Sequence, residues 1–111
     1  MTATVTAILP VFNGRTFLAE AVRSVMEQTL RPIELIVVDD GATDGSLKEL
    51  EKLREAPFPI RILRQDNKGQ SAARNLAASQ AQGEYLAFLD QDDRWYPQHL
   101  EMLVAPLVAN A

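Results

Sequence analysis

Four short apolar runs alternate along the chain with longer segments whose apolar residues recur at helical spacing. The run at 34–38 (ELIVV) constrains the fold most, because its apolar residues are continuous and do not alternate with polar ones. A continuous run of this kind predicts a strand that is buried on both faces, with other layers of structure above and below it. The expected strands are 4–9, 34–38, 60–63 and 84–89, and the expected helices are 17–28, 46–55, 71–83 and 97–108.

Alternation of strands and helices favours right-handed βαβ units, and therefore a parallel sheet. We expect an α/β fold with a Rossmann-like parallel sheet, strand order 3-2-1-4 and helices on both faces. The 111 residues and the hydrophobic content of 47% fit one domain over residues 1–111. Gly83 is expected to end the third helix, Pro97 to lie in the first turn of the last helix, and Pro106 to end or kink it.

Charge and cysteine content argue against several classes of protein. The 11 basic and 15 acidic residues give a net charge of −4, which disfavours a nucleic-acid partner. The absence of cysteine rules out a disulfide framework and thiolate chemistry, and it fits a reducing, cytoplasmic compartment. The N-terminus lacks the features of a signal peptide, and no run approaches the roughly 18 apolar residues of a membrane span.

Polar residues follow the carboxyl end of every expected strand, in the segments PVFNGR, DDGATDG, RQDNKGQSAARN and DQDDRWYP. The connections expected at the opposite edge, TLRPI, EAPFP and AQGE, carry fewer such residues. Because the carboxyl ends of parallel strands share one edge, this asymmetry predicts a ligand site there. The segment GATDGS lacks the spacing of a P-loop, and no G-x-G-x-x-G is present, which disfavours dinucleotide binding.

The densest acidic cluster follows the fourth expected strand. Asp90 and Asp92 are spaced so that both carboxylates can approach one divalent cation, and Mg²⁺ and Mn²⁺ are commonly held by one or two carboxylates together with phosphate oxygens and water. A metal held in this way can neutralise a departing diphosphate. Asp93 is interpreted as a solvated turn residue that caps the next helix.

The adjacent Asp39 and Asp40 need separate roles, because two like charges at the end of a buried strand repel each other. One carboxylate is expected to turn inward and accept hydrogen bonds from backbone amides, and the other to face the cleft and accept from a base or sugar. Farther along, Lys68 precedes a helix that carries Arg74, so either side chain could approach a phosphate at the helix N-terminus. Arg74 is equally well explained as an ion-pair partner of an aspartate at this edge.

Other notable side chains have structural explanations. His99 is the single histidine and is interpreted as a surface or packing residue, and without a second histidine or any cysteine a zinc site is disfavoured. Trp95 and Tyr96 are expected to pack under the last loop, and Met102 is expected in the core.

Taken together, the segments 4–46 and 66–100, with LPVFNG, VVDDGATDGS, NKGQSAARN and FLDQDDRWYP in this order and spacing, closely resemble the N-terminal half of family 2 glycosyltransferases. The resemblance extends from Thr4 to about Leu103. It implies half of a GT-A fold and transfer of a sugar from a nucleoside-diphosphate sugar, UDP-linked, to a glycan, lipid or protein acceptor. It also implies a divalent Mn²⁺ or Mg²⁺ ion, an inverting mechanism and a role in cell-envelope polysaccharide synthesis.

The resemblance also implies roles for particular residues. Pro10, Phe12 and Asn13 match the first loop, which borders the nucleotide. Asp40 matches the aspartate that hydrogen-bonds the base, and Asp39 has a supporting role.

The remaining matches come from the second half of the chain. Lys68, Gly69 and Arg74 match the segment that borders the base and ribose. Asp90 and Asp92 match the Asp-x-Asp signature, in which Asp92 ligates the metal and Asp90 contacts the ribose or metal-bound water.

Members of this family continue for at least as many residues again, in a second half that holds the acceptor site and, in inverting members, a carboxylate general base. The catalytic base is therefore expected beyond residue 111, since Glu101 is interpreted as solvated. We expect the chain to bind a donor without turnover, and to self-associate through an exposed sheet edge. The alternative is a non-catalytic nucleotide-binding or interaction module of the same fold. A receiver-type signalling domain fits less well, because PVFN and not an acidic pair follows the first strand.

Overall fold

The computed structural model describes residues 4–12, 15–41, 48, 56–90 and 93–109. Its elements are β1 (Val5–Val11), α1 (Arg15–Met26), β2 (Glu34–Asp40), β3 (Ile60–Gln65), α3 (Gln70–Gln80), β4 (Tyr85–Phe88) and α4 (His99–Ala109). The helix expected over 46–55 lies outside the described residues except for Lys48. Asn13 and Asp92 lie outside them too.

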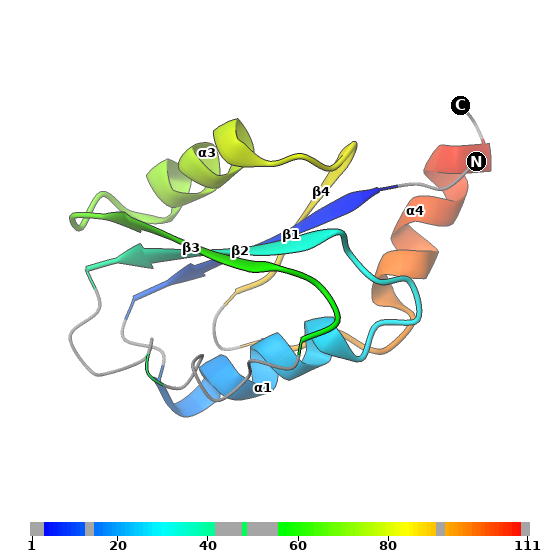
Figure 1. The fold of residues 1–111 in the computed structure, drawn as a ribbon, viewed down its shortest axis with the longest axis horizontal. Coiled ribbons are helices and arrows are strands. Elements are labelled where there is room, and N and C mark those ends of the chain that lie inside the picture. Colours follow the sequence, from blue (N-terminus) through cyan, green and yellow to red (C-terminus); the bar gives the residue numbers. More distant parts are fainter. Residues whose placement is uncertain (1–3, 13–14, 42–47, 49–55, 91–92, 110–111) are drawn as a thin grey trace.

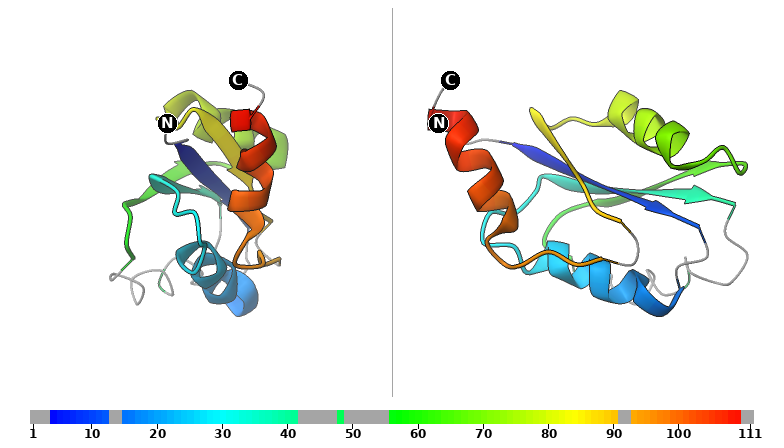
Figure 2. Two further views of the ribbon diagram at one scale, coloured as in Figure 1. Left: turned by 90° about the vertical axis from the view of Figure 1, so that its right-hand side faces the viewer. Right: turned by 180° about the vertical axis from the view of Figure 1, so that it is seen from behind.

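The four strands form one parallel sheet in the order β3-β2-β1-β4, which confirms the expected topology. Helix α3 covers one face of this sheet and α1 lies against the other (Figures 1 and 2). Helix α4 lies at the opposite end of the sheet from the carboxyl ends of β1 and β2 (Figure 1). The expected arrangement, with helices on both faces, is therefore correct.

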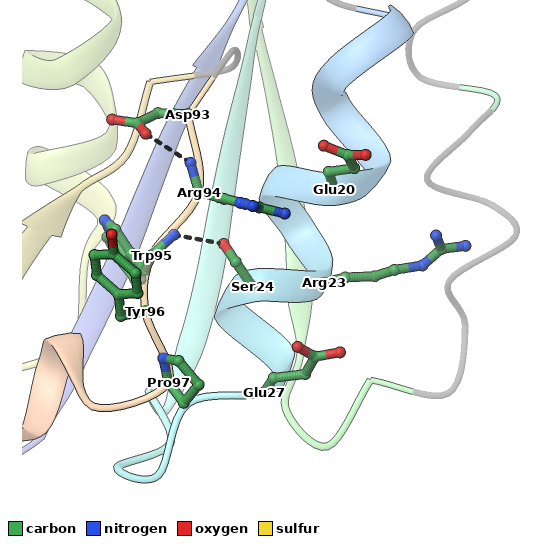
Figure 3. Close-up of a pocket in the computed structure, with 9 residues that line it drawn as sticks. All are labelled: Glu20, Arg23, Ser24, Glu27, Asp93, Arg94, Trp95, Tyr96 and Pro97. Atoms are coloured by element: carbon green, nitrogen blue, oxygen red, sulfur yellow. Dashed lines mark hydrogen bonds between the residues drawn. The ribbon is translucent and has the colours of Figure 1, made fainter.

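The segment that follows β4 returns along α1 and is fixed to it by hydrogen bonds (Figure 3). The backbone N–H of Trp95 donates to the Ser24 hydroxyl over 3.1 Å, and this hydroxyl donates to the Ala21 carbonyl over 2.7 Å. The Trp95 ring is buried and stacks on His99 with 4.7 Å between ring centroids. The packing interpretation of Trp95 and His99 is confirmed.

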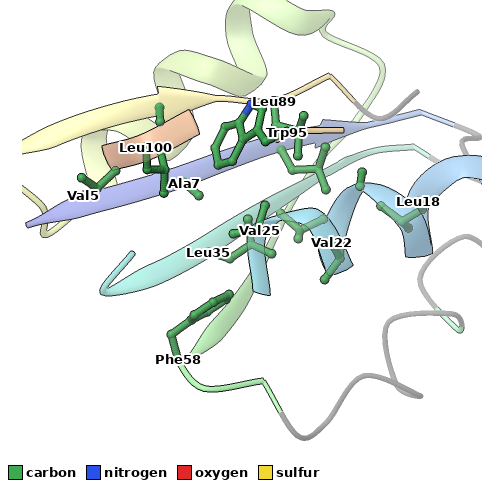
Figure 4. Packing of buried hydrophobic residues seen from close by; sticks show 14 of the residues in the cluster. Val5, Ala7, Leu18, Val22, Val25, Leu35, Phe58, Leu89, Trp95 and Leu100 are labelled. Atoms are coloured by element: carbon green, nitrogen blue, oxygen red, sulfur yellow. The ribbon is translucent and has the colours of Figure 1, made fainter. Parts of the chain in front are cut away.

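Residues of β1 and β2 are buried along their whole length, and their side chains alternate between two apolar clusters. The larger cluster lies between the sheet and α1 and extends to Trp95 and Leu100 (Figure 4). The smaller one joins Ile8, Ile36 and Val38 to Ala73 and Ala77 of α3. The small alanine side chains allow α3 to pack close to the sheet, and the double burial explains the continuous apolar run of β2.

Strand β1 continues through Pro10, where it was expected to end. The carbonyl of Ile8 accepts the N–H of Leu89 over 2.9 Å, so the backbone groups of Ile8 face β4. Residues two apart face the same neighbour, so the nitrogen of Pro10 also faces the β4 side. Because β4 ends at Phe88, opposite Ile8, the missing N–H of Pro10 costs no bond of the ladder.

The structure contradicts the helix end expected at Gly83, the helix start expected at Pro97 and a helix end at Pro106, whereas a kink at Pro106 stays a prediction. Helix α3 ends at Gln80, with the N–H of Ala81 bonded to Ala78, and not at Gly83. Helix α4 begins after Pro97 and continues past Pro106. The turn before Pro106 is exposed to water, which can hydrate the carbonyl that the proline leaves without a donor.

Two side chains assigned to the interior are on the surface. Met102 is 72% exposed, although it was expected in the core, and Tyr96 is 83% exposed, although it was expected to pack under a loop. Glu101 is exposed as expected and accepts a hydrogen bond from the Thr29 hydroxyl.

The amino ends of the strands are closed by a buried carboxylate, Glu34. It accepts hydrogen bonds from the Thr6 hydroxyl at 2.9 Å, the Gln82 backbone N–H at 2.8 Å and the Arg61 guanidinium at 3.1 Å. Gly83 lies against the same place, because a Cβ there would come within 2.6 Å of the Thr6 nitrogen. Close approach to β1, and not a helix stop, therefore explains this glycine.

Burial raises the pKa of Glu34, but the hydrogen bonds from Gln82, Thr6 and Arg61 outweigh it and hold the pKa below its usual range. The carboxylate therefore contributes stability that is complete above its unfolded pKa of about 4.3 and is lost as the pH falls through its folded pKa.

We predict that Glu34→Gln lowers the free energy of unfolding at neutral pH by about 1–3 kcal/mol, because the side-chain amide presents donors to groups that themselves donate. Urea unfolding at several pH values measures the effect, and the variant and the parent protein should converge in acid. Glu27→Gln, at an exposed glutamate, serves as the control. A loss that is equal at every pH would contradict the assignment.

Candidate functional site at the carboxyl ends of the strands

Strand pairing brings the carboxyl ends of β1, β2 and β3 together at one edge of the sheet. Val11 of β1 lies opposite Asp39 of β2, and Asp39 lies opposite Arg64 of β3. Asp40, at the next position, lies opposite Gln65. The loop before α3 lies at the same end of the sheet (Figure 1). The shared edge predicted from the sequence is therefore present for these residues.

Strand geometry separates the two adjacent carboxylates, because successive side chains of β2 point to opposite faces of the sheet. Val37 belongs to the cluster on the α1 side, and Val38 belongs to the cluster on the α3 side. Asp39 therefore faces the α1 side and Asp40 the α3 side. The electrostatic cost of placing two like charges in sequence is reduced because side chains on opposite faces of the sheet are farther apart than side chains on one face.

Asp40 is buried and binds the loop that precedes α3. Its Oδ1 accepts hydrogen bonds from the side-chain amide of Gln65 at 2.9 Å and from the backbone N–H of Lys68 at 2.7 Å. Its Oδ2 accepts the backbone N–H of Gly69 at 3.0 Å. Asp40 is thus the carboxylate that turns inward and accepts hydrogen bonds from backbone amides. Lys68 contributes its backbone N–H to this contact, and the residue itself is exposed.

The ionised form of Asp40 is favoured by its surroundings. Burial raises the pKa of this carboxyl group, but the hydrogen bonds from Gln65, Lys68 and Gly69 lower it further, so that it lies below the usual range. Helix α3 begins at Gln70, and its N-terminal dipole also favours a negative charge at this position. Asp40 is therefore a fixed negative charge near neutral pH.

Tight turns bring the ends of β2 and the β3–α3 connection together. Gly41 has φ 81° and Gly69 has φ 90°. Asn67 is a non-glycine residue that also has a positive φ, 45°. A Cβ on Gly41 would lie 3.4 Å from Oδ1 of Asn67. The left-handed conformation of these residues lets the backbone amides of 68 and 69 point at Asp40.

Asp39 is 7% exposed and lies 4.0 Å from Nε of Arg64. The Arg64 side chain is 76% exposed, so water screens this ion pair and it contributes little to stability. The pair with Arg64 is therefore not the contact that chiefly holds the Asp39 side chain in place.

Arg74 of α3 reaches over β4 to Asp90. Its Nη2 lies 3.3 Å from Oδ1 of Asp90, and its guanidinium carbon lies 5.7 Å from the centre of the Phe88 ring. Of the two alternatives for Arg74, the ion pair with an aspartate at this edge is therefore formed. Nε of Arg74 is buried and has no hydrogen-bond partner among the described residues, so the guanidinium keeps donor capacity at the site.

A small cavity opens between the end of β1 and the start of α3. Phe12, 47% exposed, lies at this cavity, and Asp40 contributes to its wall. The volume of about 40 Å³ can hold a few atoms, and not a whole nucleotide. Its lining residues are Pro10, Val11, Phe12, Asp40, Gln70 and Ala73.

Two site residues were missed by the sequence analysis, Gln65 and Gln70. Gln65 binds Asp40 and also donates to the Gly69 carbonyl at 3.1 Å, and Gln70 lines the cavity. Gln65 could have been predicted from the strand order, because β3 pairs with β2 and the residue of β3 opposite Asp40 lies beside Asp40. Gln70 could not be predicted in this way, since its position depends on how α3 packs.

The metal-binding prediction concerns residues that are only partly described. Asp90 is described and exposed, whereas Asp92 lies outside the described residues. Within the described residues, no three histidine, cysteine, aspartate or glutamate side chains gather in a way that could hold a metal ion. Asp90 keeps one carboxylate oxygen that does not bond Arg74, so a role beside a cation is compatible with its contacts.

None of the described helices is both long and apolar enough to span a membrane.

Comparison with known proteins identifies the family. The family model described as glycosyl transferase family 2 matches residues 6–111, and this chain therefore belongs to that family. A putative teichuronic acid biosynthesis glycosyltransferase of Bacillus subtilis, TuaG, is 40% identical over 100 residues, which cover 87% of this chain and 39% of that protein.

Solved structures agree with this assignment and with the GT-A fold. The crystal structure of S. aureus TarS in complex with UDP-GlcNAc has a TM-score of 0.85 and 29% identity, over 96% of this chain and 31% of that one. The mannosyltransferase PcManGT of Pyrobaculum calidifontis, in complex with GDP-Man and Mn²⁺, is 24% identical with a TM-score of 0.82, over 95% of this chain and 33% of that one, and shows the fold alone. The chain spans about a third of the length of these proteins.

We predict that Asp40→Asn opens the loop before α3. The substitution replaces one carboxylate oxygen by an amide that meets an N–H donor, so the protein should lose about 1–3 kcal/mol of stability. Amide hydrogen exchange at Lys68 and Gly69 should accelerate more than exchange in β1. Asp66→Asn, at an exposed aspartate of the same loop, is the matched control. Unchanged exchange at both amides would refute the proposed anchoring role of Asp40.

Proposed function

We propose that this chain is the donor-binding part of a glycosyltransferase that transfers a sugar from a UDP-linked donor to an acceptor, with a divalent metal and with inversion. The observation that carries the proposal is the convergence of Asp40, the small cavity and the Arg74–Asp90 pair at the carboxyl edge of the sheet, in a chain of this family. TarS, which is similar over nearly the whole chain, was crystallised with UDP-GlcNAc.

Asp40 is the proposed acceptor for the base. Its Oδ1 already accepts two hydrogen bonds, but its Oδ2 accepts one among the described residues and keeps a lone pair for an N–H of uracil. Pro10 and Phe12 would border the base at the mouth of the cavity, while Asp39 supports the strand end. Asn13, the third residue of that first-loop match, is proposed to lie on the same side of the nucleotide.

The ribose and diphosphate are proposed to lie between α3 and the end of β4. Lys68 and Gly69 would border the nucleotide through the loop that Asp40 fixes. Arg74 keeps its buried Nε as a donor and orients Asp90, which would accept a hydroxyl of the ribose or a metal-bound water.

Asp90 and Asp92 are proposed to hold Mn²⁺ or Mg²⁺. When bound, the metal would neutralise charge on the diphosphate as it leaves. The pairing of Asp90 with Arg74 orients this carboxylate at the edge of the sheet. The acceptor site and the general base are proposed to lie in parts of the protein beyond residue 111. The relatives support this, because the matched region covers only 39% of TuaG and 31% of the TarS chain.

Calorimetric titration with UDP, with and without Mn²⁺, tests the donor site. We expect Mn²⁺ to raise the affinity for UDP by about tenfold or more, which corresponds to about 1.4 kcal/mol. Asp90→Asn should reduce this increment because it removes a negative charge beside the metal and its bound water, whereas Asp66→Asn should keep it. Titration with GDP and ADP in parallel reports the preference for the base.

Absence of nucleotide binding under all these conditions would contradict the proposal. A non-catalytic binding module of the same fold would bind UDP with the same metal dependence and so would pass the titration. Transfer of sugar by the full-length protein, lost in Asp92→Asn, distinguishes the enzyme from that module.

A further inference from the structure

The side chain of Gln65, the last residue of β3, joins Asp40 to the loop that precedes α3. Its Nε2 lies 2.9 Å from Oδ1 of Asp40 and 3.1 Å from the carbonyl oxygen of Gly69. Both partners can only accept hydrogen bonds, so the side chain must present its NH₂ group to them, and both amide hydrogens are used. The orientation of this amide is therefore determined by its partners.

The position of Gln65 follows from the pairing of β3 with β2. Gln65 lies opposite Asp40 in the parallel register, and Leu63, two residues earlier, packs against the apolar cluster on the α3 side. Residues two apart in a strand point to the same face, so Gln65 and Asp40 both point to the α3 side. Their contact is therefore built into the sheet and does not depend on a ligand.

The hydrogen bonds to Asp40 use its two carboxylate oxygens unequally. Oδ1 accepts from Gln65 and from the backbone N–H of Lys68, whereas Oδ2 accepts only the N–H of Gly69 among the described residues. A carboxylate oxygen has two lone pairs, so Oδ1 is saturated and the open acceptor position is on Oδ2. Asp40 also forms part of the wall of the small cavity at the end of β1. The contact with Gln65 therefore determines which oxygen can accept from a ligand.

The charged groups near Asp40 do not hold its carboxylate. Within the described part of the chain Asp40 forms no ion pair, and it is the one titratable residue among those that line the cavity. Strand β1 carries no charged residue, and Arg64 of β3 faces the α1 side. Arg74 of α3 is paired with Asp90. In the described structure one neutral side chain, Gln65, and two backbone amides therefore position this carboxylate.

An ionised carboxylate can only accept hydrogen bonds, and it therefore discriminates between nucleotide bases. Uracil presents an N3–H, whereas cytosine presents an unprotonated N3 at the same place. The carboxylate would find no donor at that nitrogen, and a site built to bind an N–H rejects an analogue that lacks it. UDP and CDP share their ribose and diphosphate, so the ratio of their affinities reports the contact at the edge of the base.

We propose that Gln65 is the positioning residue for the base of the donor. By holding Oδ1, its amide turns the open lone pair of Asp40 Oδ2 toward the cavity, where the N–H of the base donates to it. The site then prefers a nucleotide whose base presents a ring N–H over one that presents a ring-nitrogen acceptor. This inference rests on the proposed function, because it requires Asp40 to be the acceptor for the base.

Calorimetric titration of the full 111-residue chain with UDP and with CDP, both with Mn²⁺, tests the proposal. The parent should bind UDP at least about tenfold more tightly than CDP, and Gln65→Ala should weaken UDP binding by about tenfold while CDP binding changes less than about threefold. A loop that was only loosened would weaken both nucleotides alike, because residues 68 and 69 match the segment that borders the shared ribose. Gln98→Ala, at an exposed glutamine outside the site, should leave both affinities unchanged.

Gln65→Glu gives a second readout, which keeps the length of the side chain. Two carboxyl groups in hydrogen-bond contact cannot both ionise, so the pair formed with Asp40 holds one proton and its apparent pKa is raised. The proton supplies a donor to Oδ1, and once it is lost the two charges repel. The UDP affinity of Gln65→Glu should therefore fall relative to the parent as the pH rises from about 5.5 to about 8, and recover when the pH is lowered again. Gln98→Glu should follow the parent.

The proposal is overturned if Gln65→Ala weakens UDP and CDP binding equally, or if Gln65→Glu follows the pH profile of the parent. It is also overturned if the parent binds CDP as tightly as UDP. Each of these results leaves the proposed donor site intact as long as the parent binds UDP. A parent protein that binds no UDP rejects the donor site and the role of Gln65 together.

Discussion

Burial of β1 and β2 on both faces is the constraint on which the rest of the structure depends. Neither strand can carry a charge within the sheet without a partner, so its polar residues gather at the strand ends. Glu34 at the amino end needs Thr6, Arg61 and the backbone of Gln82 to be accommodated. Asp40 at the carboxyl end is satisfied by the loop before α3. The same rule therefore produces a structural network at one edge and a candidate site at the other.

Much of this organisation could be predicted from the sequence, because the continuous apolar run and the alternation of elements follow local rules. Strand order and the position of the site at the carboxyl edge were predicted in this way. The ends of elements were not, because contacts distant in sequence decide them. Gly83 is explained by its approach to Thr6, and Pro10 by the early end of β4. Tyr96 was misassigned because the sequence does not show which of the neighbouring Trp95 and Tyr96 faces the core, and only Trp95 is buried.

For the site, the sequence could predict that two adjacent carboxylates need different roles. It could not decide which of Asp39 and Asp40 turns toward α3, because that choice depends on the direction of the first residue of the strand. The Arg74–Asp90 pair was one of two open alternatives, since helix α3 could be placed over the sheet only approximately. The chemistry of the site could thus be predicted from residue types. The hydrogen-bond partner of each carboxylate could not, because it depends on how α3 packs and how β3 pairs with β2.

The hydrogen bonds from residues 68 and 69 to Asp40 also act on strand alignment. Side chains of a strand alternate with period two, so a shift of β2 by one residue relative to β3 would present Asp39 to α3 and turn Asp40 to the opposite face. The backbone amides of residues 68 and 69 would then lose their carboxylate acceptor. The apolar residues of β2 would also move from one apolar cluster to the other. A contact that looks local to the site therefore also selects the correct alignment of the sheet against its nearest misfolded alternative.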